Sequence, residues 1–347
     1  MVSDHLLALA AEVYGFDAHT LGFISATSNE VYHFAKDGVA YILRLSRRPI
    51  EWLPKVIAEM DWLGYLASNG VSVSLPLKSR SGELATAVKD HDQTHILTAF
   101  TMANGRFWDK RDPDRWNAAV FTNWGCVMGE MHRLTKSYVP PDDRTVRDTF
   151  AERETIPDKL RACPSVYAIG QALLKEILDL PVDQDGYGLI HYDLHPWNFM
   201  LEGDRINVFD FDDCLYGWFA LDMGVALYHG LWWGRHDDAN PSPNDLSTSL
   251  IRSFVKGYLS RNSLSAYWLA KVPLFMRYRQ ICKFSWFFDP DHIDEEQRTI
   301  RHQTLLESVL YTLMQPDGVH PNTEGHAVMF QNVWAVLEGM LAFDAID

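Results

Sequence analysis

The stretch His191–Asn198, HYDLHPWN, gathers two histidines, an aspartate and an asparagine. Shortly after it, residues 208–213 read VFDFDD and place three aspartates at the end of an apolar run. A charged group near apolar surface is costly to remove from water unless it finds a partner, a metal or a substrate. Three explanations are therefore open: a metal site, a phosphoryl-transfer site, or polar turns without a chemical role.

The composition restricts the class of protein. The chain of 347 residues is long enough for a large core and for two lobes, and its 47% hydrophobic and 22% charged residues are typical of a globular protein. Its net charge is −15 and it has no dense basic run, so neither nucleic acid nor an anionic membrane is an expected partner. The acidic charge favours solubility and, weakly, a cationic substrate. Nothing in the sequence indicates the oligomeric state.

The cysteines and the apolar segments favour a cytoplasmic protein. The four cysteines are widely spaced without a CxxC pair, which is typical of reduced thiols rather than of disulfides or a zinc site. The N-terminal residues lack the basic leader of a signal peptide. Residues 214–234 are apolar enough to resemble a membrane span, but Asp222 and several glycines within them favour a buried helix.

The first hundred residues predict a small antiparallel sheet that carries one helix. Two alternating apolar runs flank the turn KDG at 36–38, and a second pair flanks the polar residues 89–94, so each pair predicts a hairpin. Between the hairpins, apolar residues recur at helical spacing over 52–69 and Gly70 follows as a stop.

Beyond residue 104 the pattern becomes mainly helical. A short hairpin, FML–EGD–INVF, separates the two polar stretches and should bring them together in space. We expect an α+β fold of two lobes: residues 1–103 as a nucleotide-binding N-lobe, and residues 104–347 as a C-lobe with the catalytic loop, the metal site and the acceptor pocket. The predicted helices cover 120–134, 165–180, 216–233, 246–260, 265–288, 295–314 and 327–343.

One charged pair is predicted within the first lobe. In the strand AYILRL, Arg44 shares a face with the apolar Ile42, and Glu59 falls within the apolar stripe of the following helix. An unpaired buried charge costs several kcal/mol, so we expect Arg44 and Glu59 to pair. By itself such a pair could be only structural.

The ligand types distinguish between the metal and the phosphoryl-transfer hypotheses. His191, Asp193 and His195 could bind zinc, but the downstream stretch offers only aspartates. Oxygen ligands such as Asn198 and Asp210 suit Mg²⁺, which recruits phosphate oxygens. Phosphoryl transfer needs a carboxylate to accept the hydroxyl proton, an Asn and an Asp to hold Mg²⁺, and a cation on the phosphates. Asp193, Asn198, Asp210 and Arg44 match these roles in turn.

The spacing makes this hypothesis specific. Asp193 precedes Asn198 by five residues, as in the kinase catalytic loop H-R-D-L-x-x-x-N, and Asp210 is followed by Phe as in D-F-G. Here Tyr192 replaces the arginine and Asp212 replaces the glycine. The chain resembles the aminoglycoside phosphotransferase and choline kinase family, small-molecule kinases with a protein-kinase-like fold. The stretches that carry the resemblance are SNEVYHF, YILRL, WGCVMGEMHRL, LIHYDLHPWNFML, INVFDFDD and ALDMGVAL.

The resemblance implies a role for each matching residue. Asp193 is the expected base, Asn198 and Asp210 are the expected Mg²⁺ ligands, and Glu59 holds Arg44 on the phosphates of ATP. Asp222 would brace the catalytic loop. Thr101 and Ala103 of the connector would present backbone groups to adenine, and Thr27 and Ser28 would cover the phosphates. Two departures stand out: an arginine replaces the lysine of protein kinases, and the loop 26–29 has no glycine, so nucleotide affinity could be weak.

Together these observations predict an ATP- and Mg²⁺-dependent kinase that phosphorylates a hydroxyl of a small molecule, such as an amino alcohol, amino acid, sugar or aminoglycoside-like compound. A Ser/Thr protein kinase and a nucleotide-binding pseudokinase are the alternatives, although no A-P-E motif is present. Asp212 and Asp213 could assist the metal or be plain surface carboxylates. An aromatic group is expected to belong to the core rather than to a cage for an ammonium: Trp232, Trp233, Trp286, Phe287 and Phe288.

Overall fold

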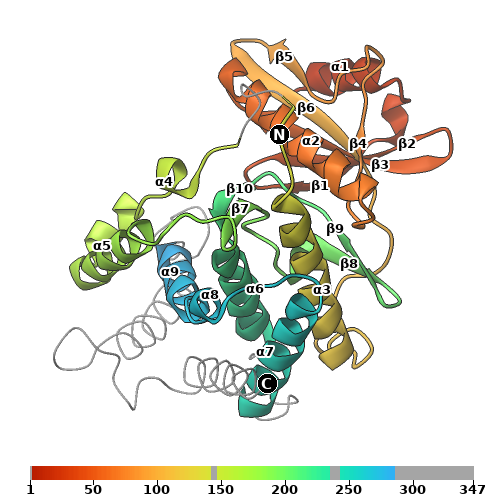
Figure 1. Ribbon diagram of the computed structural model, residues 1–347. Coiled ribbons are helices and arrows are strands. Elements are labelled where there is room, and N and C mark those ends of the chain that lie inside the picture. The colour runs from red at the N-terminus through yellow and green to blue at the C-terminus, as the bar shows by residue number, and fades with distance from the viewer. Residues whose placement is uncertain (1, 142–146, 235–242, 286–347) are drawn as a thin grey trace. The chain divides into compact units, whose positions relative to one another are not determined.

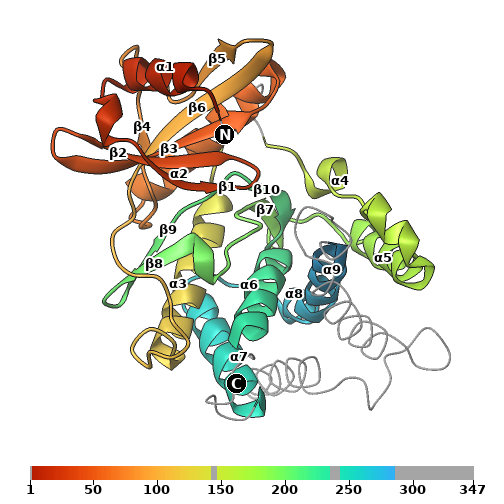
Figure 2. The same ribbon diagram turned by 180° about the vertical axis from the view of Figure 1, so that it is seen from behind.

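The computed structural model describes residues 2–141, 147–234 and 243–285 (Figures 1 and 2). The chain divides into two compact units that alternate along the sequence. Unit 1 comprises Met1–Phe107, Ser137–Asp148 and Asn198–Cys214, and unit 2 comprises Trp108–Lys136, Thr149–Trp197 and Leu215–Asp347. The lobe boundary expected after residue 103 stays a prediction.

An antiparallel sheet forms the frame of unit 1 (Figure 1). Its strands run in the order β1-β2-β3-β6, and β6 pairs with both β4 and β5 along its other edge. Both predicted hairpins are confirmed: β2 and β3 pair around Asp37 and Gly38, and β5 and β6 pair around His91 and Asp92. The bounds are β1 Gly22–Ala26, β2 Glu30–Lys36, β3 Val39–Arg47, β4 Pro76–Leu77, β5 Thr86–Asp90 and β6 Gln93–Thr101.

Two helices cover opposite faces of this sheet. Helix α1 (Asp4–Tyr14) packs on the face that carries Leu43 and Leu97, and the sequence did not predict it. The predicted helix is α2 (Leu53–Ser68), whose Val56 packs with Ile96 on the other face. Because successive side chains of a strand point to opposite faces, Arg44 lies on the α2 side of β3. The alternation that fills the core around α1 thus directs a charged residue toward α2.

Unit 1 also includes the hairpin that separates the two polar stretches. Strands β8 (Phe199–Glu202) and β9 (Arg205–Val208) pair as predicted, and Gly203 in their turn adopts a left-handed φ of 60°. The main chain of Val208 exchanges hydrogen bonds with residues 72–74, which tie β9 to the rest of the unit. The hairpin ends where the sequence VFDFDD begins.

Unit 2 is mainly helical. Its long helix α6 (Phe219–Gly234) is buried along most of its length and packs against α7 and α9. A two-stranded ribbon of β7 (Tyr187–Ile190) and β10 (Leu215–Trp218) adjoins it. The remaining helices are α3 (Ala118–Thr135), α4 (Phe150–Arg153), α5 (Pro164–Leu178), α7 (Pro243–Leu259), α8 (Ala266–Leu269) and α9 (Val272–Phe284).

Two predicted helix boundaries are wrong. Residues 216–218 belong to β10 rather than to the helix expected over 216–233, because they pair with β7. The single helix expected over 265–288 is two helices: α8 ends at Leu269, and Pro273 stands in the first turn of α9, where its missing N–H has no cost. The expected helices at 295–314 and 327–343 lie outside the described residues. In the described part of the chain, no helix has the length and apolarity to cross a membrane.

Candidate active site

The predicted pair of Arg44 and Glu59 is present in unit 1. Both side chains are buried, and the two guanidinium nitrogens Nη1 and Nη2 each donate to a different carboxylate oxygen of Glu59 at 2.8 Å. Nε of Arg44 donates to the hydroxyl of Thr98 at 3.2 Å. Burial alone would lower the pKa of Arg44, but Glu59 and then Asp212 raise it above its ordinary value. The bidentate geometry fixes a permanent cation between β3 and α2.

Asp212 is the second acidic partner of this cation. Its carboxylate lies 3.8 Å from Nη1 of Arg44 and 3.3 Å from Nη2 of Arg48, and it accepts a hydrogen bond from the amide of Asn29 at 2.9 Å. Burial raises the pKa of Asp212, but Arg44 and the Asn29 hydrogen bond outweigh it, so the net shift is downward. The sequence left its role open, and the structure gives it one: it ties the acidic segment to β3 and to the loop before β2.

The residues just before Asp212 are held by packing and by the main chain. Phe211 is buried and meets Trp62 of α2 edge to face, with ring centroids 5.4 Å apart. Asp210 has a left-handed φ of 64°, a conformation that residues other than glycine rarely adopt. The N–H of Phe209 donates to the carbonyl of Asn198 at 3.0 Å. This hydrogen bond joins Asn198 to the residue directly before Asp210, so both predicted metal ligands belong to unit 1.

The donor atoms of Asn198 and Asp210 fit a hard cation. An amide oxygen and a carboxylate are ligands that Mg²⁺ accepts while it keeps waters and binds phosphate oxygens. Nowhere in the described ranges do three His, Cys, Asp or Glu side chains gather as a metal site. Asn198 and Asp210 offer oxygen donors to Mg²⁺, and the phosphates of a bound nucleotide would supply further oxygens.

Arg147 is a residue of this region that the sequence analysis missed. It is buried, and its guanidinium donates to three main-chain carbonyls: those of Cys214 at 2.7 Å, Lys55 at 3.2 Å, and Asp212. It thereby fastens the acidic segment to the start of α2. No local pattern marks an arginine whose partners are backbone atoms from two distant segments, so the sequence carried no signal for it.

The residues predicted to contact nucleotide lie at the ends of strands in unit 1. Thr27 and Ser28 are exposed in the turn between β1 and β2, which closes with a hydrogen bond from the N–H of Thr27 to the carbonyl of Asn29 at 3.1 Å. The N–H of Thr101 already donates to the carbonyl of Leu75 at 2.8 Å. The backbone of Ala103, just beyond β6, forms no hydrogen bond with the described residues. Ala103 is thus the better placed of the two connector residues to bind a base.

In unit 2, Asp222 braces the loop that carries Asp193, as the sequence predicted. Its carboxylate is fully buried and accepts hydrogen bonds from the N–H of Tyr192 at 2.8 Å and from the N–H of His191 at 3.1 Å. Nε2 of His132 lies 3.1 Å from the same carboxylate, and its Nδ1 lies 2.9 Å from the hydroxyl of Tyr258. These contacts hold Tyr192 at a left-handed φ of 69°, directly before Asp193.

Asp193 belongs to unit 2, as Asp222 does, whereas the predicted metal ligands and nucleotide contacts belong to unit 1. One of its carboxylate oxygens accepts from Nη2 of Arg279, a residue of α9, and the other lies 3.3 Å from Nε2 of His195. Burial raises the pKa of Asp193, but Arg279 and then His195 outweigh it, and the net pKa lies well below its usual range. The candidate base is therefore ionised at neutral pH. The sequence did not predict the contact with Arg279.

The two histidines of the loop form backbone hydrogen bonds, as expected. Nδ1 of His191 accepts from the N–H of Asp193 at 3.3 Å, and Nδ1 of His195 accepts from the N–H of Trp197 at 3.2 Å. The edge of His195 also meets the ring of Trp233, with centroids 5.1 Å apart. Trp233 belongs to an aromatic cluster, whose other members are Trp108, Trp116, Trp197 and His229. Trp286, Phe287 and Phe288 lie outside the described residues.

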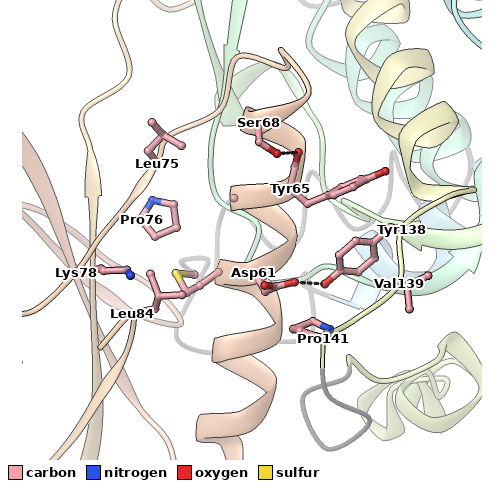
Figure 3. A pocket seen from close by; sticks show the side chains of 12 residues that line it. Asp61, Tyr65, Ser68, Leu75, Pro76, Lys78, Leu84, Tyr138, Val139 and Pro141 are labelled. Carbon is pink, nitrogen blue, oxygen red and sulfur yellow. Dashed lines mark hydrogen bonds between the residues drawn. The ribbon is translucent and has the colours of Figure 1, made fainter. Parts of the chain in front are cut away.

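A pocket of about 470 Å³ is found elsewhere in unit 1, beside the exposed side of α2 (Figure 3). Its walls include Tyr65, Pro76 and Val139, and the carboxylate of Asp61 there accepts from the hydroxyl of Tyr138 at 2.7 Å. None of the residues predicted for the active site is among those that line it. The pocket is thus separate from the acidic segment and from Arg44.

The chain is similar to known phosphotransferases over most of its length. The sequence profile described as "Phosphotransferase enzyme family" matches residues 20–261. An amicoumacin kinase of Bacillus subtilis (strain 168) is 34% identical over 306 residues, which cover 85% of this chain and 88% of that protein.

Two solved structures extend this similarity to the fold. That of an amicoumacin kinase, hAmiN, in complex with AMP-PNP, Ca²⁺ and Ami superposes with a TM-score of 0.79 at 28% identity, covering 89% of this chain and 93% of that one. That of a microcompartment-associated aminopropanol kinase has a TM-score of 0.67 at 23% identity, covering 91% and 99%. The second similarity concerns the fold, which is the α+β, protein-kinase-like fold expected from the sequence.

Proposed function

The chain belongs to the phosphotransferase enzyme family and is a kinase, and from this premise we propose that it transfers the γ-phosphate of ATP to a hydroxyl of a small molecule with the aid of Mg²⁺. One observation supports this proposal most. Within unit 1, a buried arginine held by Glu59 lies beside the acidic segment that carries Asp210 and Asp212. A fixed cation next to hard oxygen ligands is what a nucleotide triphosphate and its metal require.

Asp193 is the proposed base. The oxygen of the acceptor hydroxyl bonds to the γ-phosphorus, the bond from that phosphorus to the bridging oxygen of ADP breaks, and the hydroxyl proton passes to the carboxylate of Asp193. Its ionised state at neutral pH suits this role, because only the carboxylate form can accept the proton.

The remaining roles follow from the charges. Arg44 neutralises phosphate oxygens, and Glu59 keeps its guanidinium in place. Asn198 and Asp210 would hold Mg²⁺, which, when bound, neutralises charge on the β- and γ-phosphates. Ala103 would hydrogen-bond the base of the nucleotide, and Thr27 and Ser28 would lie over the phosphates.

The acceptor is proposed from the relatives. The 34% identical protein is named an amicoumacin kinase, and a structural neighbour is named an aminopropanol kinase. We expect an acceptor that carries both a hydroxyl and an amine, since the net charge of −15 also favours a cationic ligand. Amicoumacin is therefore the first acceptor to test, followed by aminopropanol.

The test measures ADP release and product mass with ATP, Mg²⁺ and each acceptor in turn. The wild-type chain should phosphorylate at least one of them, and EDTA should abolish the reaction. The variant Asp193→Asn should lower kcat by about 10²-fold or more, in line with the loss of a positioned base, while the calorimetric affinity for ATP stays within twofold.

A matched control distinguishes the loss of the proposed base from the loss of a negative charge elsewhere. Asp179→Asn removes an exposed carboxylate at the end of α5 and should leave kcat unchanged. Retained turnover in Asp193→Asn would refute the role of Asp193. Nucleotide binding without transfer to any hydroxyl compound would favour a pseudokinase, and transfer to a protein instead would favour a protein kinase.

A further inference from the structure

Helix α9 brings a cation to the proposed base. Arg279 donates through Nη2 to one carboxylate oxygen of Asp193, although 86 residues separate them in the sequence. The guanidinium is largely buried, with 12% of the side chain exposed, and the carboxylate is 20% exposed. A contact at this depth is screened little by water, so it constrains Asp193 far more than a surface ion pair would.

His229 of α6 fixes the other side of this guanidinium. Nε of Arg279 donates to Nε2 of His229 at 3.1 Å, and an imidazole can accept at Nε2 only when it is neutral with its proton on Nδ1. Burial, and then the charge of Arg279, holds the pKa of His229 well below its ordinary value, which agrees with the neutral form. Arg279 therefore donates hydrogen bonds to two separate elements, to His229 of α6 and to Asp193 of its loop.

We propose that Arg279 is a positioning residue for the phosphoryl transfer: it holds one oxygen of Asp193 so that the carboxylate keeps a single orientation during turnover. This inference rests on the proposed function, because it assigns Asp193 as the base. His195 lies at the second oxygen, 3.3 Å away. Each carboxylate oxygen has two lone pairs, so both contacts leave acceptor capacity for the hydroxyl of a substrate.

The charges around Asp193 also give Arg279 a measurable signature. Burial raises the pKa of Asp193, and among the described residues Arg279, then His195 of its own loop and then Lys283 of α9 lower it. If Arg279 is removed, burial remains and its main opponent is lost. The pKa of Asp193 should then rise, and activity should fall at acidic pH, where a larger share of the carboxyl group is protonated and cannot accept a proton.

The experiment compares kcat against pH for the wild type, Arg279→Ala and Arg279→Lys, with the acceptor that the wild type phosphorylates. Arg279→Ala should lower kcat about 10- to 100-fold at neutral pH and place the acidic limb of the profile at a higher pH than in the wild type, while the KM for ATP stays within twofold. Arg279→Lys, which keeps a positive charge, should move the limb back in part.

Arg277→Ala is the matched control. Arg277 is half-buried two residues earlier on α9, and its Nε makes no hydrogen bond with the described residues. Its removal should leave the acidic limb where it is in the wild type. A loss of kcat in Arg279→Ala that is equal at every pH would show a merely structural role and overturn the proposal, as would a wild-type profile.

A double-mutant cycle in thermal stability tests the contact between Arg279 and Asp193 separately from the proposed function. If Asp193→Asn retains turnover, the proposed function fails; if it is inactive while Arg279→Ala keeps the wild-type profile, only the inference fails. Thermal melts of Asp193→Asn, Arg279→Ala and the double variant report on the contact without any turnover. The double variant should melt no lower than the worse single variant, and additive losses would overturn the contact.

Discussion

Two residues beside the proposed chemistry have backbone conformations that cost free energy. Tyr192 and Asp210 have positive φ values, and the other two non-glycine residues of this kind in the described chain, Asp37 and His91, lie in hairpin turns. Such conformations persist when the surroundings fix them, and they concentrate at functional sites. For Tyr192 the fixing group is the carboxylate of Asp222, which receives its N–H.

Replacement of Asp222 by asparagine should therefore loosen the loop before Asp193. The amide offers one acceptor oxygen in place of two and turns a donor toward N–H groups that already donate. We expect a loss of about 1–3 kcal/mol in the free energy of unfolding, measured by urea titration, and a lower kcat. Lys175→Ala, which removes an exposed cation on α5, is the control. A free energy of unfolding within about 0.5 kcal/mol of the wild-type value, the usual range for a surface substitution, would argue against the bracing role.

At the scale of elements, α3 and α7 pack so closely that glycines are required. A Cβ atom added to Gly125 would lie 1.9 Å from the carbonyl oxygen of Phe254 on α7. A Cβ atom added to Gly257 of α7 would lie 2.0 Å from the carbonyl oxygen of Thr122 on α3. Backbone atoms cannot rotate away as side chains do, so either substitution would push the two helices apart.

We predict opposite effects for alanine at two helical glycines. Gly257→Ala should lower the free energy of unfolding by about 1–3 kcal/mol, because it overpacks the contact between α3 and α7. Gly64→Ala, on the exposed side of α2 with nothing within 4 Å of the added Cβ, should raise it by about 0.5–1 kcal/mol through helix propensity. Urea unfolding of both variants checks this, and a neutral Gly257→Ala would contradict the close packing.

Local patterns predicted those elements whose partners lie near in the sequence. Both hairpins of the sheet and the helix that carries Glu59 were predicted because a short-range period sets them. Strand β10 was not, because only its pairing with β7 distinguishes residues 216–218 from the first turn of an apolar helix. Helix α1 was not predicted, although its buried residues Leu6, Ala10 and Tyr14 recur at helical spacing.

Residues of the candidate site were likewise predictable where a local pattern marks them, and not where a distant partner does. The pairing of Arg44 with Glu59 was predictable because both residues broke an apolar pattern. The contacts of Arg147 and Arg279 were not, because an arginine in a polar stretch gives no sign of which distant carbonyl or carboxylate it will meet. Only the folded chain sets those partners.

For the whole molecule, buried histidines predict sensitivity to acid. Burial lowers the pKa of His132 despite the opposing Asp222, and burial with Arg279 lowers that of His229. Both stay neutral in the folded state below about pH 6.5, where an unfolded histidine takes up a proton. Stability should therefore be level above this pH and fall as the pH decreases, until the folded pKa is reached, by at most about 1.4 kcal/mol per pH unit for each histidine.

The free energy of unfolding at pH 7.5, 6.5 and 5.5 tests this dependence. The variant His132→Gln should show a shallower decline below pH 6.5, whatever its stability at pH 7.5. His5→Gln, which changes an exposed histidine of α1, should keep the wild-type slope. A decline that His132→Gln leaves unchanged would show that this histidine is not one of the groups that titrate on unfolding.

The contact between Asn29 and Asp212 spans 183 residues, and this separation matters while the protein is being made. A ribosome that adds about 5–20 residues per second needs on the order of 10–40 s between the two. During that time Arg44 and Glu59 are already synthesised, but Asp212, the second acidic partner of Arg44, is not. Trp62 likewise lacks its packing partner Phe211. A chain released early would display an uncovered tryptophan and an unsatisfied asparagine, features by which a chaperone or protease could tell it from the finished enzyme.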